Sequence, residues 1–579
     1  MLAQSSVRPT DVEARVVAPN AHLGGAAHAA RDLRAIRLGI LVTAIVAVFG
    51  VIARFQIMLE GLARPLATNI FFRLYALYEL PFLLLLLLAA VAALLITSAR
   101  KPAATQLPWL DALAAPNARS VGLAAVVVLV GTMLVSRLVL HGYAFSMDEF
   151  SADFQARLFA HGQYKALLPG AWRPFAGGIT PIFVGYDGPS GSWLSQYLPG
   201  YALLKSPFVA LGAGTLLNPL FAALSIIALT AVARRLWPNE GLRPWLAIAL
   251  LATSSQFVVT SGTAYSMPAH LCANLVWLWL YLRDDDRSWV AALLVGVLAL
   301  GLHNPFPHAL FVAPFLIRLL RDRRWGRVGW AAAIYGIGSI GWFLWLRSLQ
   351  SLGPVGGEGM LSVLHVPNAT ILWLNAINVT LLFTWQTPVF GLLVIAGLVQ
   401  SRRLAPPLRD LAWGALLTVV FYSFFPATQG HGWGYRYAYQ ILGSVALLAA
   451  AGISPLIASV GPRRATLFIV ASLVVTVLAQ LPKRLSETEG FVRPFAAASK
   501  YVLSRPADVV LVHGSNVWYG RDLIRNDPFL QGQPVVVEAD GLSAAGRAEL
   551  ERAHPGRVME VKDTELLKLG MTPWTSRPR

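Results

Sequence analysis

Residues 80–96, LPFLLLLLLAAVAALLI, decide the fold of this chain, because they carry no charge over the length of a long helix. Residues 121–135, VGLAAVVVLVGTMLV, have the same character. Each stretch approaches the ~20 residues that an α-helix needs to cross the ~30 Å hydrocarbon core of a bilayer. Both therefore predict membrane-spanning helices.

The whole chain is apolar for its length. Hydrophobic residues make up 56% of the 579 residues, and charged residues only 13%. A soluble core of this size does not need so much apolar sequence, whereas a chain solvated by lipid does. We expect an all-α polytopic membrane bundle of about thirteen spans. The predicted cores are 36–55, 80–98, 120–140, 217–236, 244–260, 267–283, 289–303, 306–320, 327–346, 388–400, 411–426, 437–458 and 464–481.

The positive charge is placed at alternate ends of these stretches. The formal net charge is +18, and Lys and Arg gather in short loops such as 234–243, 318–327 and 463–464. This is the positive-inside bias of cytoplasmic loops, and no soluble domain carries the basic cluster that nucleic acid needs. The amino terminus is then inside and the carboxyl terminus outside. Segments 197–213 and 370–386, which are short or interrupted, are interpreted as interfacial or re-entrant.

The chain divides into four predicted parts, of which the last is extracytoplasmic. Apolar runs at 508–513, 534–538 and 557–561 surround a helical stretch at 543–553. They predict a small α/β domain that can fold alone. The parts are a disordered cytoplasmic tail (1–35), an amino-terminal transmembrane hairpin (36–118), a transmembrane module (119–481) with its first outer loop at 141–198, and the α/β domain (482–579).

The first outer loop opens on two adjacent carboxylates, Asp148 and Glu149. Phe150 and Phe154 follow at helical spacing, which predicts an amphipathic helix on the membrane surface. Ser146 and Glu149 have the spacing of a capping box, which explains both of them structurally. It leaves Asp148 unexplained, and a carboxylate at the mouth of a span is costly unless it is exposed, paired or used. Asp148 is therefore the candidate working carboxylate.

Several motifs follow one another along the chain. Asp148-Glu149 comes just after a span, and WLSQYLPGY at 193–201 closes the first loop. Further elements are Ala233-Arg234-Arg235-Leu236, Gly434-Tyr435-Arg436-Tyr437, Asn526-Asp527-Pro528 and His554-Pro555-Gly556-Arg557. Together they resemble the GT-C superfamily of glycosyltransferases that use polyprenyl-phosphate sugars. Within it they are similar to the branch of the protein O-mannosyltransferases, the lipid A aminoarabinose transferase and the rhizobial galacturonosyltransferases (families 39 and 83). Leu198 departs from that pattern, which has proline there, and the first two spans look like an added hairpin.

The resemblance implies transfer of one sugar from a polyprenyl-phosphate donor to a lipid, glycan or protein at the outer face of the cytoplasmic membrane, with inversion. Transfer needs a base for the acceptor proton and positive charge for the departing phosphate. Asp148 would be the base, with Glu149 as an orienting partner or as a ligand of a divalent metal, which two acids could hold but nothing requires. Arg436 would bind the phosphate with its planar fork. Further candidates for donor or substrate binding are Tyr435, Tyr437, His431, Gln196, Tyr197, Arg157, Lys205 and His303, followed by Lys165 and Arg173.

Other interpretations stay open. Arg436 can also be a snorkelling arginine in an aromatic belt. His303 and His308 are five residues apart, which does not make a helical metal face, and the acidic run at 284–286 is typical of a solvated turn. The chain could also be a transporter or flippase of lipid-linked saccharide, or a non-catalytic subunit with the same fold. Membrane spans are expected for all of these proteins. A transporter would not need the long first loop and its acid pair, whereas composition does not separate the non-catalytic subunit from an enzyme.

Overall fold

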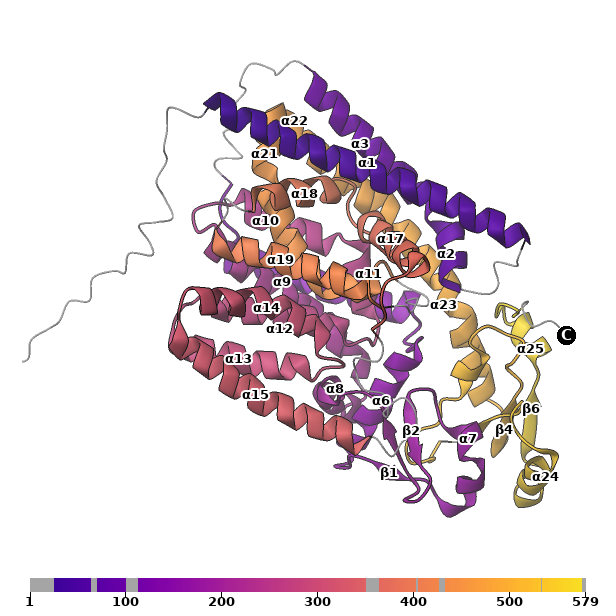
Figure 1. Cartoon of the computed structure of the whole chain (residues 1–579). Coiled ribbons are helices and arrows are strands. Elements are labelled where there is room, and N and C mark those ends of the chain that lie inside the picture. The colour runs from indigo at the N-terminus through magenta and orange to yellow at the C-terminus, as the bar shows by residue number, and fades with distance from the viewer. Residues whose placement is uncertain are drawn as a thin grey trace, which may run out of the picture.

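The computed structural model describes residues 25–63, 70–99, 113–349, 364–401, 405–425, 433–532 and 534–574. Its helices form one bundle, and two small sheets lie together at one end of it (Figure 1). The first helices are α1 (Gly25–Ala63), α2 (Ile70–Tyr78), α3 (Leu80–Ser98), α5 (Ala118–Leu134), the π-helical η2 (Val135–Val139), α6 (Met147–Ala160), η3 (Gly170–Phe175), α7 (Ala176–Ile179), α8 (Gly200–Ala210), η4 (Gly214–Leu216) and α9 (Leu217–Leu236). The next are α10 (Leu242–Ala252), α11 (Ser255–Gly262), α12 (Met267–Tyr281), α13 (Asp286–Leu300), α14 (Phe306–Arg321), α15 (Trp325–Ser348), α17 (Ala369–Thr384), α18 (Phe390–Gln400) and α19 (Pro406–Tyr422). The last are η6 (Arg436–Ile441), α20 (Leu442–Ala451), α21 (Ile453–Val460), α22 (Pro462–Val475), the π-helical η7 (Thr476–Gln480), α23 (Leu481–Leu503), η8 (Gly520–Leu523), α24 (Ala544–Ala553) and α25 (Asp563–Lys568).

Each predicted span coincides with helix, which confirms the all-α bundle. Within the described residues, seven helices are long and apolar enough to cross a membrane, and the pair α10 and α11, bent by 54°, would make an eighth. The other five predicted spans fall on α12, α13, α14, α18 and α19, which have only 11 to 17 residues. The predicted number of about thirteen is therefore larger than the number that length and composition support.

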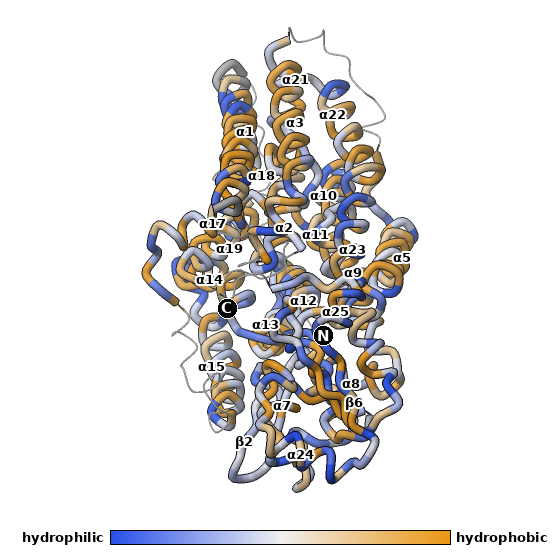
Figure 2. The backbone as a smooth tube through the Cα atoms, turned by 90° about the vertical axis from the view of Figure 1, so that its right-hand side faces the viewer, coloured by the Kyte–Doolittle hydropathy of each residue, from blue (hydrophilic) through white to orange (hydrophobic). Residues whose placement is uncertain are grey.

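The outer helices keep their apolar side chains uncovered. Figure 2 shows long apolar stretches along α1, α3 and α5. Leu88, Leu95 and Leu123 on these helices are about two-thirds exposed, at 64%, 65% and 66%. Because the described part of the chain leaves them uncovered, lipid is the solvent that such a surface requires.

The amino-terminal hairpin is fixed to the bundle by a buried ion pair. Glu79, just before α3, receives two hydrogen bonds from the guanidinium of Arg484 on α23, at 2.8 and 2.7 Å. That guanidinium lies between the rings of Phe82, at 3.5 Å, and Trp385, at 4.2 Å. Trp385 also donates to Glu79 at 3.2 Å. The Glu79 carboxylate is therefore met by a guanidinium and by an indole N–H.

The two sheets differ in their strand directions. β1 (Ala166–Leu167), β3 (Ser192–Ser195) and β2 (Val184–Asp187) of the first loop are antiparallel, in the order β1-β3-β2. β5 (Val535–Glu538), β4 (Val509–Val512) and β6 (Val558–Val561) are parallel, in the order β5-β4-β6. These strands and α24 confirm the α/β elements predicted in the tail. The helix Pro462–Leu503 runs unbroken through residue 482, so the sheet begins only after it.

The tail and the first loop share one hydrophobic core, and this corrects the expectation for α6. Phe154 and Leu158 of α6 are buried in the same cluster as Val509 and Val537 of the tail sheet. The apolar face of α6 therefore packs against protein, and does not lie on the membrane surface as predicted. Independent folding of the tail stays a prediction.

The ion pair at the hairpin gives a stability prediction. Arg484→Ala should lower the free energy of unfolding by about 3–5 kcal/mol, because it leaves the Glu79 carboxylate buried without its cation. Thermal unfolding of the purified protein in detergent measures the change. Arg493→Ala on the same helix is the control, because the Arg493 side chain is 66% exposed. Equal melting temperatures for the two variants would contradict the structural role of the pair.

Candidate active site

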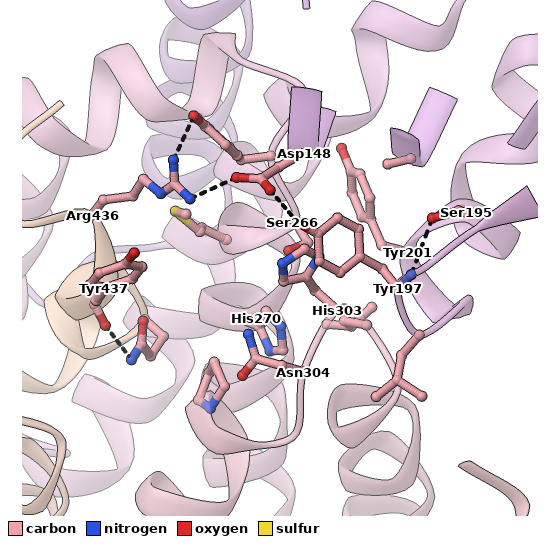
Figure 3. Close-up of a pocket in the computed structure, with 18 of the residues that line it drawn as sticks. Asp148, Ser195, Tyr197, Tyr201, Ser266, His270, His303, Asn304, Arg436 and Tyr437 are labelled. Carbon is pink, nitrogen blue, oxygen red and sulfur yellow. Dashed lines mark hydrogen bonds and ion pairs between the residues drawn. The ribbon is translucent and has the colours of Figure 1, made fainter. Parts of the chain in front are cut away.

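Five segments that are distant in sequence enclose one cavity beside α6. They are one face of α6, the end of the first loop with the start of α8, the turn between α11 and α12, the turn between α13 and α14, and η6 (Figure 3), and Tyr422 at the end of α19 adds to the wall. The cavity has a volume of about 60 Å³. Asp148 and Arg436, which the sequence proposes as base and phosphate ligand, both line it. Tyr197, His303 and Tyr437 line it as well.

Asp148 and Arg436 form a buried ion pair in this cavity. The Nη2 of Arg436 lies 2.7 Å from Oδ2 of Asp148, and their side chains are only 15% and 12% exposed. The hydroxyl of Tyr197 donates to Oδ1 of the same carboxylate. The Nη1 of Arg436 donates to the hydroxyl of Tyr265 at 2.9 Å, and the guanidinium lies over that ring. The pair joins residues that are 288 positions apart in the chain.

The surroundings of Asp148 keep its carboxyl group ionised. Burial by itself would raise the pKa of Asp148, but the charge of Arg436 and the hydrogen bond from Tyr197 outweigh burial, so the pKa is lowered. Burial lowers the pKa of His303, whose ring stands 4.0 Å from that of Tyr197. The cavity therefore holds a carboxylate, a guanidinium and a neutral imidazole at neutral pH.

Glu149 is directed elsewhere and does not line the cavity. Its Oε2 accepts from the backbone N–H of Ala264 at 2.7 Å, and its Oε1 accepts from that of Ser146 at 3.3 Å. The capping box predicted for α6 is thus present. The bond to Ala264 also holds the turn between α11 and α12 against α6. Glu149 and Asp148 therefore have separate partners: Glu149 bonds to backbone N–H groups, and Asp148 bonds to Tyr197 and Arg436.

Two of the remaining candidates lie on the opposite side of α6. Arg157 and Lys205 line a second cavity of about 240 Å³. There the Lys205 ammonium pairs with Asp153. Arg173 donates to the carbonyl of Leu168 at 3.2 Å. None of these cations lies on the cavity of Asp148.

Three other candidates are also separate from the cavity. Tyr435 is 1% exposed and donates to Asn375 at 3.4 Å. Gln196 and Lys165 are not among the lining residues. His431 lies outside the described residues.

Two further sequence features, the histidine pair and the acidic run at 284–286, have structural explanations. His308 is buried between Asn274 and Tyr335, with its ring nitrogens 2.8 and 2.9 Å from their side chains. Asp284 pairs with Arg324 and Arg327, as a solvated turn on the arginine-rich side would. In the described part of the chain, no three His, Cys, Asp or Glu side chains converge in a way that could hold a metal ion.

The sequence did not indicate several residues of the cavity wall. Tyr265, Ser266, His270 and Gln440 line it from the turn between α11 and α12, from α12 and from η6. None of them belongs to a motif with a recognisable spacing. The only local signal is the break between α11 and α12, because polar residues at a break in a span tend to line a cavity.

No protein-family model matches the chain, and no curated protein matches it. Among solved structures it is similar to ArnT from Cupriavidus metallidurans bound to undecaprenyl phosphate, with 15% identity and a TM-score of 0.47 over 78% of this chain and 91% of ArnT. The apo state of ArnT gives 12% identity and a TM-score of 0.48 over 78% and 96%. The arabinofuranosyltransferase AftD from Mycobacteria gives 15% and 0.41 over 73% of this chain and 32% of AftD.

The buried Glu149 predicts a pH dependence of stability. Burial raises its pKa from 4.5 to about 7, so between these values the folded protein holds a proton that the unfolded chain has released. At ~1.4 kcal/mol per pKa unit, this shift corresponds to ~3 kcal/mol of folding stability. That stability is fully present below pH 4.5, and it is lost as the pH rises through about 7. Glu149→Gln removes the titration and keeps an acceptor oxygen. From pH 5 to 8 the melting temperature of the wild type should therefore fall relative to that of the variant.

The exposed Glu551 supplies the control for this measurement. Glu551→Gln should follow the wild type across the whole range. If Glu149→Gln did the same, the proton would not be held by Glu149.

Proposed function

We propose that this chain is a membrane glycosyltransferase of the GT-C type. It would move a sugar from a polyprenyl-phosphate donor to a lipid, glycan or protein acceptor at the outer face of the cytoplasmic membrane. The observation that carries the proposal is the buried pair of Asp148 and Arg436 in one cavity. A carboxylate beside a guanidinium offers a proton acceptor and an anion-binding fork, which are the two groups that sugar transfer from a phosphate needs.

The proposed reaction is a single displacement. The acceptor hydroxyl attacks the anomeric carbon on the face opposite the phosphate, and the new C–O bond forms as the bond to the phosphate oxygen breaks. Asp148 takes the acceptor proton. The electron pair of the broken bond leaves with the lipid phosphate, whose charge Arg436 offsets. This displacement inverts the anomeric configuration, and in the proposal it needs no metal, because Arg436 supplies the positive charge.

Donor binding would make Asp148 a better base. In the described state, Arg436 is divided between Asp148 and the Tyr265 hydroxyl. A phosphate that enters the cavity competes for the same guanidinium and weakens its hold on the carboxylate. The pKa of Asp148, which Arg436 keeps low, would then rise toward the operating pH, where a general base is most effective.

Sugar binding requires one wall of the cavity to move. The volume of about 60 Å³ is far below the ~300–1,000 Å³ of typical ligand sites. Tyr197 closes the cavity, because its hydroxyl meets Asp148 and its ring rests against His303. Displacement of Tyr197 would open the site and expose a face of His303 to the sugar. Tyr437, stacked on Tyr422 at 5.1 Å, forms the opposite aromatic wall.

The role of Asp148 can be tested with one substitution. Asp148→Asn should lower kcat by about 100-fold or more, because a positioned general base contributes ~10²–10⁴-fold. KM for the donor should not rise, because Arg436 no longer pairs with a carboxylate and is available to the phosphate. The measurement is transfer of labelled sugar from purified polyprenyl-phosphate donors to an envelope extract.

Asp187→Asn is the matched control, since Asp187 lies in the same loop and bonds only to its own turn at Ser190. Full activity of Asp148→Asn would refute the base. If the wild type transfers no sugar from any donor but moves lipid-linked saccharide across vesicles, the chain is a transporter. If it does neither, the reading as a non-catalytic subunit is favoured.

Tyr197→Phe tests the hydrogen bond to Asp148 separately. Without the hydroxyl, the Asp148 carboxylate loses a stabilising donor, so its pKa rises. A hydrogen bond to a charged group is worth ~1.5–3 kcal/mol, which corresponds to about one to two pH units. The acid limb of the kcat/KM profile should therefore move to higher pH by about that amount. An unchanged limb would mean that the group titrating in catalysis is not Asp148.

A further inference from the structure

Helices α14 and α19 enclose a cavity at the arginine-rich end of the bundle. They approach closely at Gly414, where a Cβ would lie 3.3 Å from the carbonyl oxygen of Phe311. Toward the arginine-rich loops they leave a cavity of about 330 Å³ between them. The lining side chains recur every three or four residues on each helix, so a single face of each helix forms a wall. This cavity has no part in the proposed sugar transfer.

The cavity holds more positive than negative charge. Arg318 is paired with Asp410, whose carboxylate oxygen lies 2.6 Å from its Nε. Arg321 stands at the mouth with its side chain 69% exposed, 3.5 Å from Asp322. Arg409 forms no direct ion pair in the described part of the chain, although its charge acts on the Asp410 carboxylate, and its Nε is buried without a hydrogen-bond acceptor there. A buried N–H without an acceptor is unfavourable, so an anionic oxygen beside this Nε would be stabilising.

The mouth of the cavity also carries large apolar side chains. Ile317 and Trp413 line it and are 60% and 53% exposed, although each belongs to a helix that coincides with a predicted span. Tryptophan is favoured at the boundary between hydrocarbon and headgroups. An apolar rim beside buried guanidinium groups therefore matches a molecule that has an acyl chain and an anionic head.

We propose that this cavity binds an anionic phospholipid from the leaflet on the arginine-rich side. Its phosphate would lie between Arg409 and Arg321 and would supply the acceptor that the Nε of Arg409 lacks. Its acyl chain would run along Ile317 and Trp413. Basic pockets between spans are a known means of holding anionic headgroups. A zwitterionic lipid fits less well, because its own cation would meet Arg318 and Arg321.

The test measures lipid retention by the full-length protein. The protein is reconstituted in nanodiscs of phosphatidylcholine with a rising fraction of phosphatidylglycerol, and the bound lipid is counted by native mass spectrometry. The wild type should retain phosphatidylglycerol in preference to phosphatidylcholine. Arg409→Gln should reduce the retained phosphatidylglycerol by about three- to tenfold, because it removes one charge-assisted contact to the phosphate. Arg409→Lys, which keeps the charge, should retain more than Arg409→Gln.

Arg463→Gln is the matched control, because Arg463 is an exposed arginine of the same predicted side that does not line the cavity. It should retain lipid as the wild type does. The proposal is overturned if Arg409→Gln retains as much phosphatidylglycerol as the wild type, if Arg463→Gln loses equally much, or if phosphatidylcholine is held equally well. Full displacement of the lipid by inorganic phosphate would show that the ligand is the free anion. Should Arg409→Gln not fold, Arg321→Gln at the exposed mouth makes the same comparison.

Discussion

Charge that is buried in an apolar bundle has to be paired, and this requirement determines how distant parts of the chain meet. Removing one partner of a buried pair leaves the other charge without compensation, at a cost of ~3–5 kcal/mol. Each buried pair is therefore a strong constraint on the packing of the helices that carry it. Three such pairs in the described part of the chain are Glu79 with Arg484, Asp148 with Arg436, and Asp410 with Arg318. They fix the amino-terminal hairpin to α23, the first outer loop to η6, and α19 to α14.

The same requirement gives two neighbouring acids, Asp148 and Glu149, different partners. Glu149 is buried and the Asp148 side chain is only 12% exposed, but successive side chains on a helix point in directions about 100° apart, so they meet different surroundings. Asp148 faces the guanidinium of Arg436, and its pKa is lowered. Glu149 faces the backbone N–H groups of Ser146 and Ala264, without a guanidinium, and burial raises its pKa to about 7. One helix turn thus carries an ionised group in the cavity and an anchoring group behind it.

The tail contributes to the site through the loop. Trp193 of β3 donates to the carbonyl of Pro528 at 3.0 Å. Arg525 donates to the carbonyls of Ala144 and Phe145, at 2.6 and 3.0 Å, directly before the capping box of α6. The start of α6, and with it Asp148, is therefore held by the bundle on one side and by the tail on the other. A loop held in this way presents its carboxylate in a fixed place, as a preorganised site requires.

Local sequence determined the elements of this protein. Uncharged runs such as 80–96 specified spans, the spacing of Ser146 and Glu149 specified a cap, and the tail strands followed from alternating apolar runs and turns. Asp148 and Arg436 could be singled out because each is a charge in an apolar context that needs an explanation. Only the tertiary structure decided that they meet, that Glu149 reaches Ala264, and that Tyr265 and Gln440 close the same cavity. Periodicity and capping act over a few residues, whereas a contact across 288 positions depends on how the whole bundle packs.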